Sequence, residues 1–296
     1  MIVYAGPVKR EMKGRQNPIR LGGPVFKETK DVQQWVEEHR RLGYSAAYCP
    51  LKADADENLI RLYDDTARKE NLIIAEVGAW SNPISPNEKQ RKEAIEHCCA
   101  QLHLADQLGA NCCVNIAGSR NAEKWDGPHV DNLTENTFDM IVEIVRGIID
   151  RVQPVRTFYT LETMPYAYPD SVKSYLRLIK AIDRKQFAVH LDPVNLINSP
   201  ERYYNNGALI ADCFKVLGPY IKSCHAKDII LKDGFPVNIS ECRPGLGTLD
   251  YVSFLKEVSR FTDIPVMLEH LETAEEYEKA ADYVRSVGKK NGVAFL

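Results

Sequence analysis

Four side chains that could bind a metal or move a proton stand near the C-terminal ends of four apolar runs. They are Glu162 in "YTLE", Asp192 in "VHLD", His225 in "KSCHA" and Glu269 in "PVMLE". A buried strand is expected to be apolar throughout. Taken singly, such a residue is ordinarily a solvated charge or a partner for a helix N-terminus. Together, three carboxylates and one imidazole form a mostly oxygen-donor set that suits Mn2+ or Mg2+.

The elements that would position these residues alternate along the chain from about residue 18. Strand-like runs are expected at 18–22, 44–51, 72–80, 111–118, 157–164, 187–194, 221–228 and 265–271. Helical runs are expected at 30–42, 56–70, 86–108, 134–152, 170–183, 206–217, 250–260 and 274–289. Strands that alternate with helices pair in parallel, so this order predicts an α/β fold, a single-domain (β/α)8 TIM barrel.

An open doubly wound sheet is the alternative fold. It would ordinarily carry a glycine-rich phosphate turn after an early strand, and Gly22-Gly23 is too little for that. We therefore expect a barrel over residues 18–296, preceded by an N-terminal extension at 1–17 that wraps the barrel or a partner subunit. Active-site residues of a barrel project from the C-terminal ends of its strands. The four side chains should thus meet around one metal ion.

Composition restricts the class of protein. Among 296 residues, 38 Lys and Arg stand against 41 Asp and Glu, a net charge of −3, so no global basic field attracts nucleic acid or an anionic membrane. No apolar stretch is long enough to cross a bilayer, and the first residues lack the order of a signal peptide. The eight cysteines include no CxxC pair. Reduced thiols in a cytoplasmic protein are the expectation.

The order of the motifs resembles the xylose isomerase-like TIM-barrel superfamily. The motifs are LETMP with Glu162, HLDPVN with Asp192, CHAKD with His225, the PGxGxxD turn at 244–250 and MLEH with Glu269. The tagatose/psicose 3-epimerases and inosose dehydratases belong to this superfamily. The resemblance covers about residues 18–290 and is looser in the N-terminal half. It implies that the four residues hold one divalent metal, Mn2+ before Mg2+, Co2+ or Zn2+.

The activity implied by the resemblance is that of a sugar isomerase or epimerase. A carbon-bound proton next to a carbonyl is too weak an acid for a free carboxylate at neutral pH. A metal that bridges the carbonyl oxygen and the neighbouring hydroxyl offsets the charge of the enediolate as it forms. Glu162 and Glu269, one on each face of the sugar, would be the catalytic acid/base pair. The expected partner is a small sugar or cyclitol, and a homo-oligomer is compatible with the sequence.

Two positions depart from the sugar-epimerase pattern. Asn195 stands three residues after Asp192, where the epimerases carry a His, and residues 226–231 lack the Arg that follows their metal-binding His. Both positions contact substrate hydroxyls in the family, so Asn195 is a substrate-binding candidate. A lyase on the same barrel, either an inosose-type dehydratase or a C-glycoside deglycosylase, is therefore the alternative activity.

Two basic side chains in the C-terminal half are further substrate-binding candidates. Lys227 is either a substrate-binding cation with Asp228 as its orienting partner, or the two form an ion pair on the rim. Arg243, before the PGxGxxD turn, either reaches a sugar or phosphate or packs its own loop.

The N-terminal half offers aromatic and acidic candidates. Trp80 ends the third strand-like run and would stack on a sugar face. Glu76 is either a substrate contact or a charge that braces the barrel. In "KWDGPH", Trp125 and His129 lie where a lid would fall. Of the two histidines beside metal ligands, His190 should be a satisfied interior histidine, whereas His270 should point away from the side that Glu269 faces.

Two functions from other classes are less compatible with these residues. Abasic-site DNA endonucleases share the superfamily but need further histidines after the second and third strands, where this chain reads "AAYCPLK" and "AEVGAWS". A non-catalytic sugar sensor would not need the full set of four metal ligands.

Overall fold

The computed structural model describes residues 16–296, so most of the expected N-terminal extension lies outside the described residues. Eight parallel strands close into a barrel in the order β1-β10-β7-β6-β5-β4-β3-β2. These strands are β1 (Arg20–Gly22), β2 (Ala46–Tyr48), β3 (Ile73–Gly78), β4 (Cys112–Asn115), β5 (Tyr159–Glu162), β6 (Phe187–Leu191), β7 (Ile221–Ala226) and β10 (Pro265–Leu268). Each expected strand is present, and the single-domain (β/α)8 barrel is confirmed.

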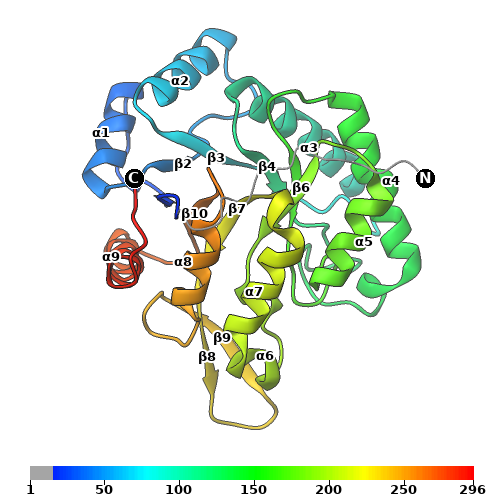
Figure 1. Ribbon diagram of the computed structural model, residues 1–296. Coiled ribbons are helices and arrows are strands. Elements are labelled where there is room, and N and C mark those ends of the chain that lie inside the picture. The colour runs from blue at the N-terminus through cyan, green and yellow to red at the C-terminus, as the bar shows by residue number, and fades with distance from the viewer. Residues whose placement is uncertain (1–15) are drawn as a thin grey trace, which may run out of the picture.

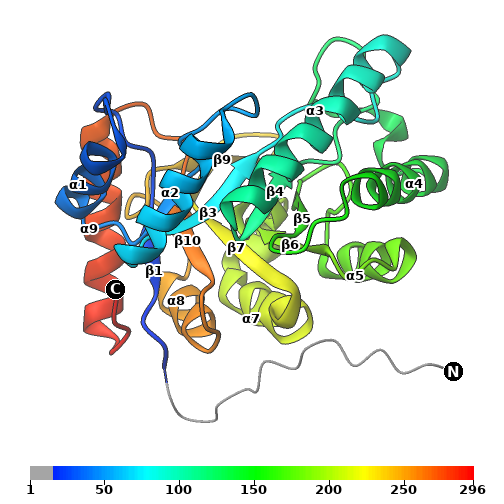
Figure 2. The ribbon, with the colours of Figure 1, turned by 90° about the horizontal axis from the view of Figure 1, so that it is seen from above.

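Helices surround the strands in both ribbon views (Figures 1 and 2). They are α1 (Val32–Leu42), α2 (Glu57–Lys69), α3 (Glu88–Leu108), α4 (Glu135–Val152), α5 (Val172–Ile182), α7 (Asn206–Leu217), α8 (Tyr251–Ser259) and α9 (Ala274–Lys290). The sequence does not predict the short helix α6 (Pro200–Tyr204) or the 3-10 turns η1 (Val130–Leu133), η2 (Val194–Leu196) and η3 (Gly218–Tyr220). These short pieces lie in connections, where periodicity is too brief to detect.

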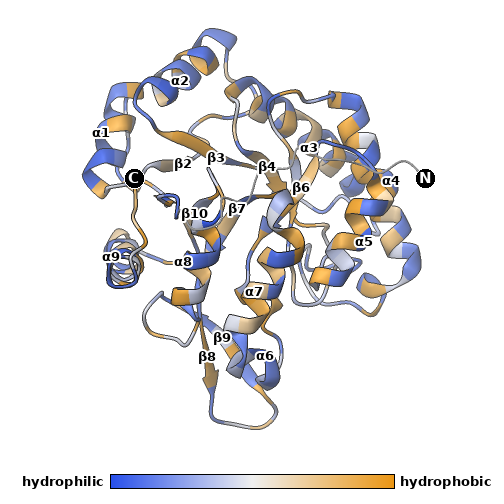
Figure 3. Ribbon diagram, in the orientation of Figure 1, coloured by the Kyte–Doolittle hydropathy of each residue, from blue (hydrophilic) through white to orange (hydrophobic). Residues whose placement is uncertain are grey.

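Apolar strands and amphipathic helices together form the core. Every residue of β4, β5, β6 and β10 is buried, which explains their nearly continuous apolar sequence. In Figure 3 the helices carry both hydrophobic and hydrophilic residues, as expected for elements with one face on the barrel and one in solvent. All eight cysteines are free, as the sequence predicts, and most of them are buried among these apolar side chains.

Local signals fix the ends of several helices. Thr134 caps α4, since its hydroxyl accepts a hydrogen bond from the backbone N–H of Thr137 at 3.3 Å. Helix α5 begins at Val172, two residues after the expected start at 170, with Ser171 and Ser174 forming a reciprocal capping box. Gly43 ends α1 at φ 66°, in the left-handed region that glycine tolerates best.

Strand register brings the predicted site residues to one end of the barrel. Glu162 in β5 lies beside His190 in β6, and His225 in β7 lies beside Met267 in β10. Asp192 and Glu269 follow their strands directly. The C-terminal ends of β5, β6, β7 and β10 are neighbours in the closed sheet, so one half of the barrel mouth carries all four side chains.

An antiparallel hairpin extends the connection between β7 and α8. Its strands are β8 (Asp228–Lys232) and β9 (Asn238–Cys242), and it leaves the barrel at the bottom of Figure 1. The sequence analysis does not predict it, since it expects no element between 228 and 250, although Ile229-Ile230-Leu231 and the turn pair Asp233-Gly234 are hairpin signals. Its base lies beside the site residues of β7, which makes it relevant below.

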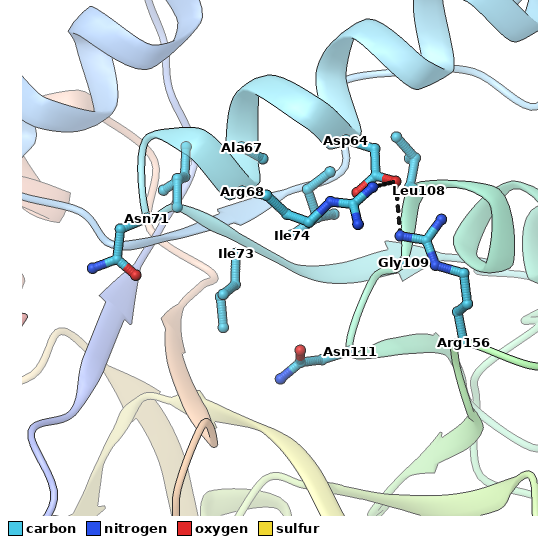
Figure 4. Close-up of a pocket in the computed structure, with 11 residues that line it drawn as sticks. Asp64, Ala67, Arg68, Asn71, Ile73, Ile74, Leu108, Gly109, Asn111 and Arg156 are labelled. Atoms are coloured by element: carbon cyan, nitrogen blue, oxygen red, sulfur yellow. Dashed lines mark hydrogen bonds and ion pairs between the residues drawn. The ribbon is translucent and has the colours of Figure 1, made fainter.

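A pocket of about 240 Å3 lies at the opposite end of the barrel, near the starts of β3 and β4. Arg68 and Arg156 both point at the buried carboxylate of Asp64, at 2.6 and 2.7 Å (Figure 4). The Arg156 guanidinium thus holds helix α2 to the loop before β5, whereas Arg68 pairs with Asp64 within α2 itself. We assign this pocket a structural role. Within residues 16–296, no helix is both long and apolar enough to cross a membrane.

Candidate active site

The four predicted ligands converge at the barrel mouth. One potential ligand atom from each of Glu162, Asp192, His225 and Glu269 lies within 4.8 Å of the others. His225 Nδ1 is 2.9 Å from Glu162 Oε1 and 2.8 Å from Glu269 Oε1. Asp192 and His225 are fully buried and Glu162 is nearly so. The sequence therefore identified a genuine cluster of side chains.

The end of β6 orients the Asp192 carboxylate. Its Oδ1 accepts the backbone N–H groups of Val194 at 2.8 Å and Asn195 at 3.3 Å, both in the 3-10 turn η2. The Thr163 hydroxyl donates to the Asp192 carbonyl at 2.7 Å and ties the ends of β5 and β6 together. Oδ2 is left facing the cluster. The Asn195 amide lies 3.3 Å from Glu162 Oε1, so this substrate-binding candidate is at the site.

Glu76 lies beneath the cluster and contacts His225 from the other side. Glu76 Oε2 is 3.2 Å from His225 Nε2, and Oε1 accepts from His190 Nε2 at 2.9 Å and from the Ser223 hydroxyl. Burial raises the pKa of Glu76, but the His190 and His225 charges outweigh it and hold the pKa well below its usual range. An ionised carboxylate can only accept hydrogen bonds, so His225 donates from Nε2.

This arrangement determines what His225 Nδ1 can do. With Nε2 donating to Glu76, Nδ1 presents either a lone pair or a proton to the two facing carboxylates. Burial lowers the pKa of His225, but the charges of Glu269, Glu76 and Glu162 raise it well above its usual value. A positive charge is therefore favoured at the point that Nδ1 and the carboxylates face. A proton or a metal ion can supply it.

Lys227 is the second buried cation of the site. Its side chain is only 2% exposed, and Nζ lies 2.8 Å from Asp192 Oδ2 and 2.6 Å from Glu269 Oε1. Burial lowers the pKa of Lys227, but the surrounding carboxylates raise it well above its usual value. The sequence left Lys227 either as a substrate-binding cation or as the partner of Asp228 in an ion pair on the rim. The ion pair with Asp228 does not form. Lys227 belongs to the cluster instead.

The β8–β9 hairpin adds a side chain that the sequence analysis missed. Glu241 in β9 accepts from Lys227 Nζ at 3.1 Å and pairs with His270 Nδ1 at 2.9 Å. The sequence predicted that His270 points away from the side that Glu269 faces. Instead, His270 adopts φ 58°, and its Nε2 lies 3.6 Å from Glu269 Oε2. The hydrogen bond that His270 donates to the Glu241 carboxylate raises the pKa of His270.

Asp228 and Arg243 organise the loop above α8. The Asp228 carboxylate accepts four backbone N–H groups, from Ile229, Gly245, Gly247 and Leu249, at 2.8 to 3.1 Å. It therefore holds the PGxGxxD turn. Arg243 pairs with Glu276 of α9 at 2.7 Å and donates to the Pro244 carbonyl at 3.2 Å. These contacts match the loop-packing alternative for Arg243.

The aromatic candidates lie on the mouth side of the barrel. The Trp80 ring is 6.4 Å from the His225 ring, centre to centre, and Trp80 and Trp125 line one groove. His129 caps η1, where its Nδ1 accepts from the Asp131 backbone N–H at 3.2 Å. The structure thus brings both tryptophans to the mouth, whereas the contacts of His129 are within its own loop.

The donor set fits a divalent cation. Asp192 Oδ2 and Glu269 Oε1 are buried and, among the described residues, receive no hydrogen bond of good geometry, although Lys227 is at ion-pair distance. Three carboxylates around one lysine leave negative charge in excess, which a hard divalent ion would offset. Glu76, His190 and His225 form a second group, but their direct hydrogen bonds occupy the space between them.

Comparison with known proteins identifies the family. The sequence profile described as the xylose isomerase-like TIM barrel matches residues 35–287. The chain belongs to this family. No curated protein matches the sequence. The family assignment agrees with the closed barrel and with the motif order of the C-terminal half.

Solved structures share the fold at low sequence identity. D-psicose 3-epimerase from Clostridium cellulolyticum with D-tagatose is 15% identical, with a TM-score of 0.67 over 93% of this chain and 100% of that one. The probable 3-DHS dehydratase of Bacillus anthracis is 18% identical, with a TM-score of 0.66 over 91% and 98%. A Mycobacterium smegmatis barrel in complex with magnesium is 15% identical, with a TM-score of 0.64 over 93% and 97%. These likenesses show the fold.

Proposed function

We propose that the protein is a divalent-metal-dependent sugar isomerase or epimerase that removes a proton from carbon next to a carbonyl. The observation that carries the proposal is the pair Glu162 and Glu269, whose carboxylates flank His225 Nδ1 at 2.9 and 2.8 Å. Residues Glu162, Asp192, His225 and Glu269 would hold the ion, with Mn2+ first and Mg2+, Co2+ or Zn2+ as further candidates. The M. smegmatis relative with magnesium and the epimerase with a bound ketose are in accord with this proposal.

The chain's own residues would divide the work of the reaction. When bound, the ion would polarise the substrate carbonyl and offset the charge that develops on its oxygen. Glu162 and Glu269 would each hold or release a proton on one face of the sugar. Asn195, beside Glu162, would orient a substrate hydroxyl, and Lys227 would supply positive charge close to Glu269. The buried position of the carboxylates would limit competition from water.

A lyase activity is the second candidate, and Asn195 is the observation that favours it. In this chain an amide, which does not titrate, contacts Glu162 where the epimerases of the family carry a His. Elimination of water needs one carboxylate base and a separate acid, and the Lys227 ammonium is suitably placed near Glu269. One solved structure with this fold is a probable dehydratase.

Proton exchange distinguishes these activities. The full chain with Mn2+ is incubated in D2O with a panel of keto-sugars and keto-inositols, and the products are followed by NMR and ultraviolet absorbance. Deuterium in a new epimer indicates an epimerase, and deuterium in a new aldose–ketose pair indicates an isomerase. An absorbing enone indicates the lyase. Metal-loaded protein that exchanges no proton with any member of the panel would contradict the proposal.

A further inference from the structure

A groove at the barrel mouth remains unused by the proposed reaction. Its volume is about 570 Å3, within the range typical of small-molecule sites. Its walls come from the segments after β3 and β4 and from the first half of α3. Trp80, Asn121, Glu123 and Trp125 line it from the loops, and Gln90 and Glu93 line it from the helix.

Trp80 lies between this groove and the cluster of proposed metal ligands, Glu162, Asp192, His225 and Glu269. Its ring lies beside His225 on one side, with ring centres 6.4 Å apart, and it lines the groove as well. The ring also packs directly against Gly78. A Cβ at that position would lie 2.5 Å from the indole nitrogen, so only glycine leaves room for the ring. Trp80 thus borders both the cluster and the groove, so a ring at the cluster and a ring in the groove would contact the same indole.

The chemistry of the walls suits a sugar ring. Trp80 and Trp125 are each 42% exposed, which is high for so large an apolar side chain. An indole face accepts the apolar C–H face of a pyranose, while amide and carboxylate groups bind its hydroxyls. Gln90 and Glu123 supply such groups in the same groove, whereas the Asn121 amide is held by the backbone of its own loop. No lining residue is Lys or Arg.

We propose that this groove is a subsite for a second, uncharged sugar ring, so that the substrate class is a neutral glycoside. This inference rests on the proposed function, because it assumes that the reacting sugar sits at the metal cluster. Glu93 and Glu123 in the walls disfavour a phosphate group. Of the cations beside the groove, Lys227 pairs with Asp192 and Glu269, and Lys124 lies 3.9 Å from Asp126. The lining residues themselves offer a sugar phosphate no Lys or Arg counterion.

Calorimetry with four probes tests the subsite. The Mn2+-loaded full chain is titrated with D-glucose, cellobiose, maltose and glucose 6-phosphate. We expect at least one disaccharide to bind at least about tenfold more tightly than glucose, because the second ring gains stacking and apolar burial. Glucose 6-phosphate should bind no more tightly than glucose.

Variants locate the gain in the groove. Trp125→Ala removes one wall, and Glu93→Trp fills the groove from the exposed surface of α3, so neither change threatens the core. Each should bring the ratio of disaccharide to glucose association constants to about one. Tyr220→Ala is the matched control, since Tyr220 is 37% exposed and precedes β7 at the opposite end of the barrel. This control should leave the ratio unchanged.

The outcomes separate this inference from the proposed activity. Glucose binding without any disaccharide advantage, or a ratio that survives both groove variants, would overturn the subsite while proton exchange in D2O could still succeed. Tighter binding of glucose 6-phosphate would overturn the neutral substrate class. A groove-dependent disaccharide advantage without proton exchange on any keto-sugar would support the subsite and contradict the activity.

Discussion

At the residue scale, Glu162 and Glu269 are distinguished from Asp192 by what holds them. Asp192 Oδ1 is fixed by two backbone N–H groups, whereas the two glutamates face His225 and the open mouth. A glutamine in place of either glutamate keeps one oxygen ligand and removes the basic electron pair. Glu162→Gln and Glu269→Gln should each retain much of the metal and lose turnover by at least about 10²-fold.

Deuterium exchange refines this prediction. If the reaction is an epimerisation, one glutamine variant should still exchange the substrate proton with D2O while forming no epimer. If it is a lyase or an aldose–ketose isomerase, only one glutamate should matter for proton removal. Rates close to wild type in both variants, with metal bound, would leave the two-carboxylate mechanism without support.

Glu76 provides a second prediction at this scale. Because it accepts from His225 Nε2, Glu76 would fix the plane of the ring and direct Nδ1 toward the proposed ion. Such partners of a metal-binding histidine contribute about 10- to 100-fold to metal affinity. Glu76→Gln should weaken Mn2+ binding by this factor in a calorimetric titration, because the amide must share one acceptor among three donors.

The matched control for Glu76 is Thr160→Val. Thr160 is equally buried, two residues before Glu162, and its hydroxyl donates to the Cys113 carbonyl at 3.2 Å. It contacts no metal ligand through that hydroxyl, so Mn2+ affinity should change little. Equal affinities in the wild type and Glu76→Gln would show that Glu76 only fills space.

The sequence predicted the cluster of Glu162, Asp192, His225 and Glu269 because the C-terminal ends of neighbouring barrel strands meet at one mouth. It left Glu76 open between two roles, although period-2 alternation places His190 and Ser223 one layer beneath Asp192 and His225. Alternation shows that His190 and Ser223 face inward, but it does not show that both contact Glu76 on β3. The contact between Lys227 and Glu241 could not be predicted either, because Glu241 lies in a hairpin that no barrel pattern predicts.

At the element scale, the loop from β7 to α8 depends on one carboxylate. Asp228 accepts four backbone N–H groups, and Gly245 and Gly247 leave no room for larger residues beside their neighbours. Asp228→Ala removes the acceptor of all four groups. It should lower the free energy of unfolding by about 2–4 kcal/mol, measured with urea in the absence of metal.

Asp233→Ala is the control within the same segment. Asp233 is exposed near the tip of the hairpin, so its loss should change the free energy of unfolding by less than about 0.5 kcal/mol. Equal effects of the two substitutions would mean that the turn is stabilised by its glycines and its packing rather than by Asp228.

The elements also show where pattern reading succeeds and where it ends. Each barrel strand and each of the longer helices lies within or close to its expected range, because burial on both faces gives strands a continuous apolar signal. The hairpin β8–β9 lies outside the barrel, so its apolar run Ile229-Ile230-Leu231 has no place in a pattern of eight alternating strands and helices. Glu241 was missed for this reason.

At the scale of the whole molecule, metal binding should be linked to stability. The cluster joins four strands, and a ligand that binds only the folded state adds about 2.7 kcal/mol of stability at one hundred times its Kd. Mn2+ should therefore raise the Tm of the wild type, and EDTA should reverse the rise. His225→Ala should keep the fold, bind less metal by elemental analysis and show a much smaller rise. An equal metal content and an equal rise in that variant would place the ion elsewhere.

The central claim is that one divalent ion binds Glu162, Asp192, His225 and Glu269. Crystals of the Mn2+-loaded protein, measured at the manganese absorption edge, test it most directly. We predict a single anomalous peak bonded to the three carboxylates and to His225 Nδ1, with Lys227 Nζ moved away from Asp192 Oδ2 and Glu76 still bonded to Nε2. A peak between Glu76 and His190, or no peak at the mouth of a protein that binds one equivalent of Mn2+, would contradict the claim.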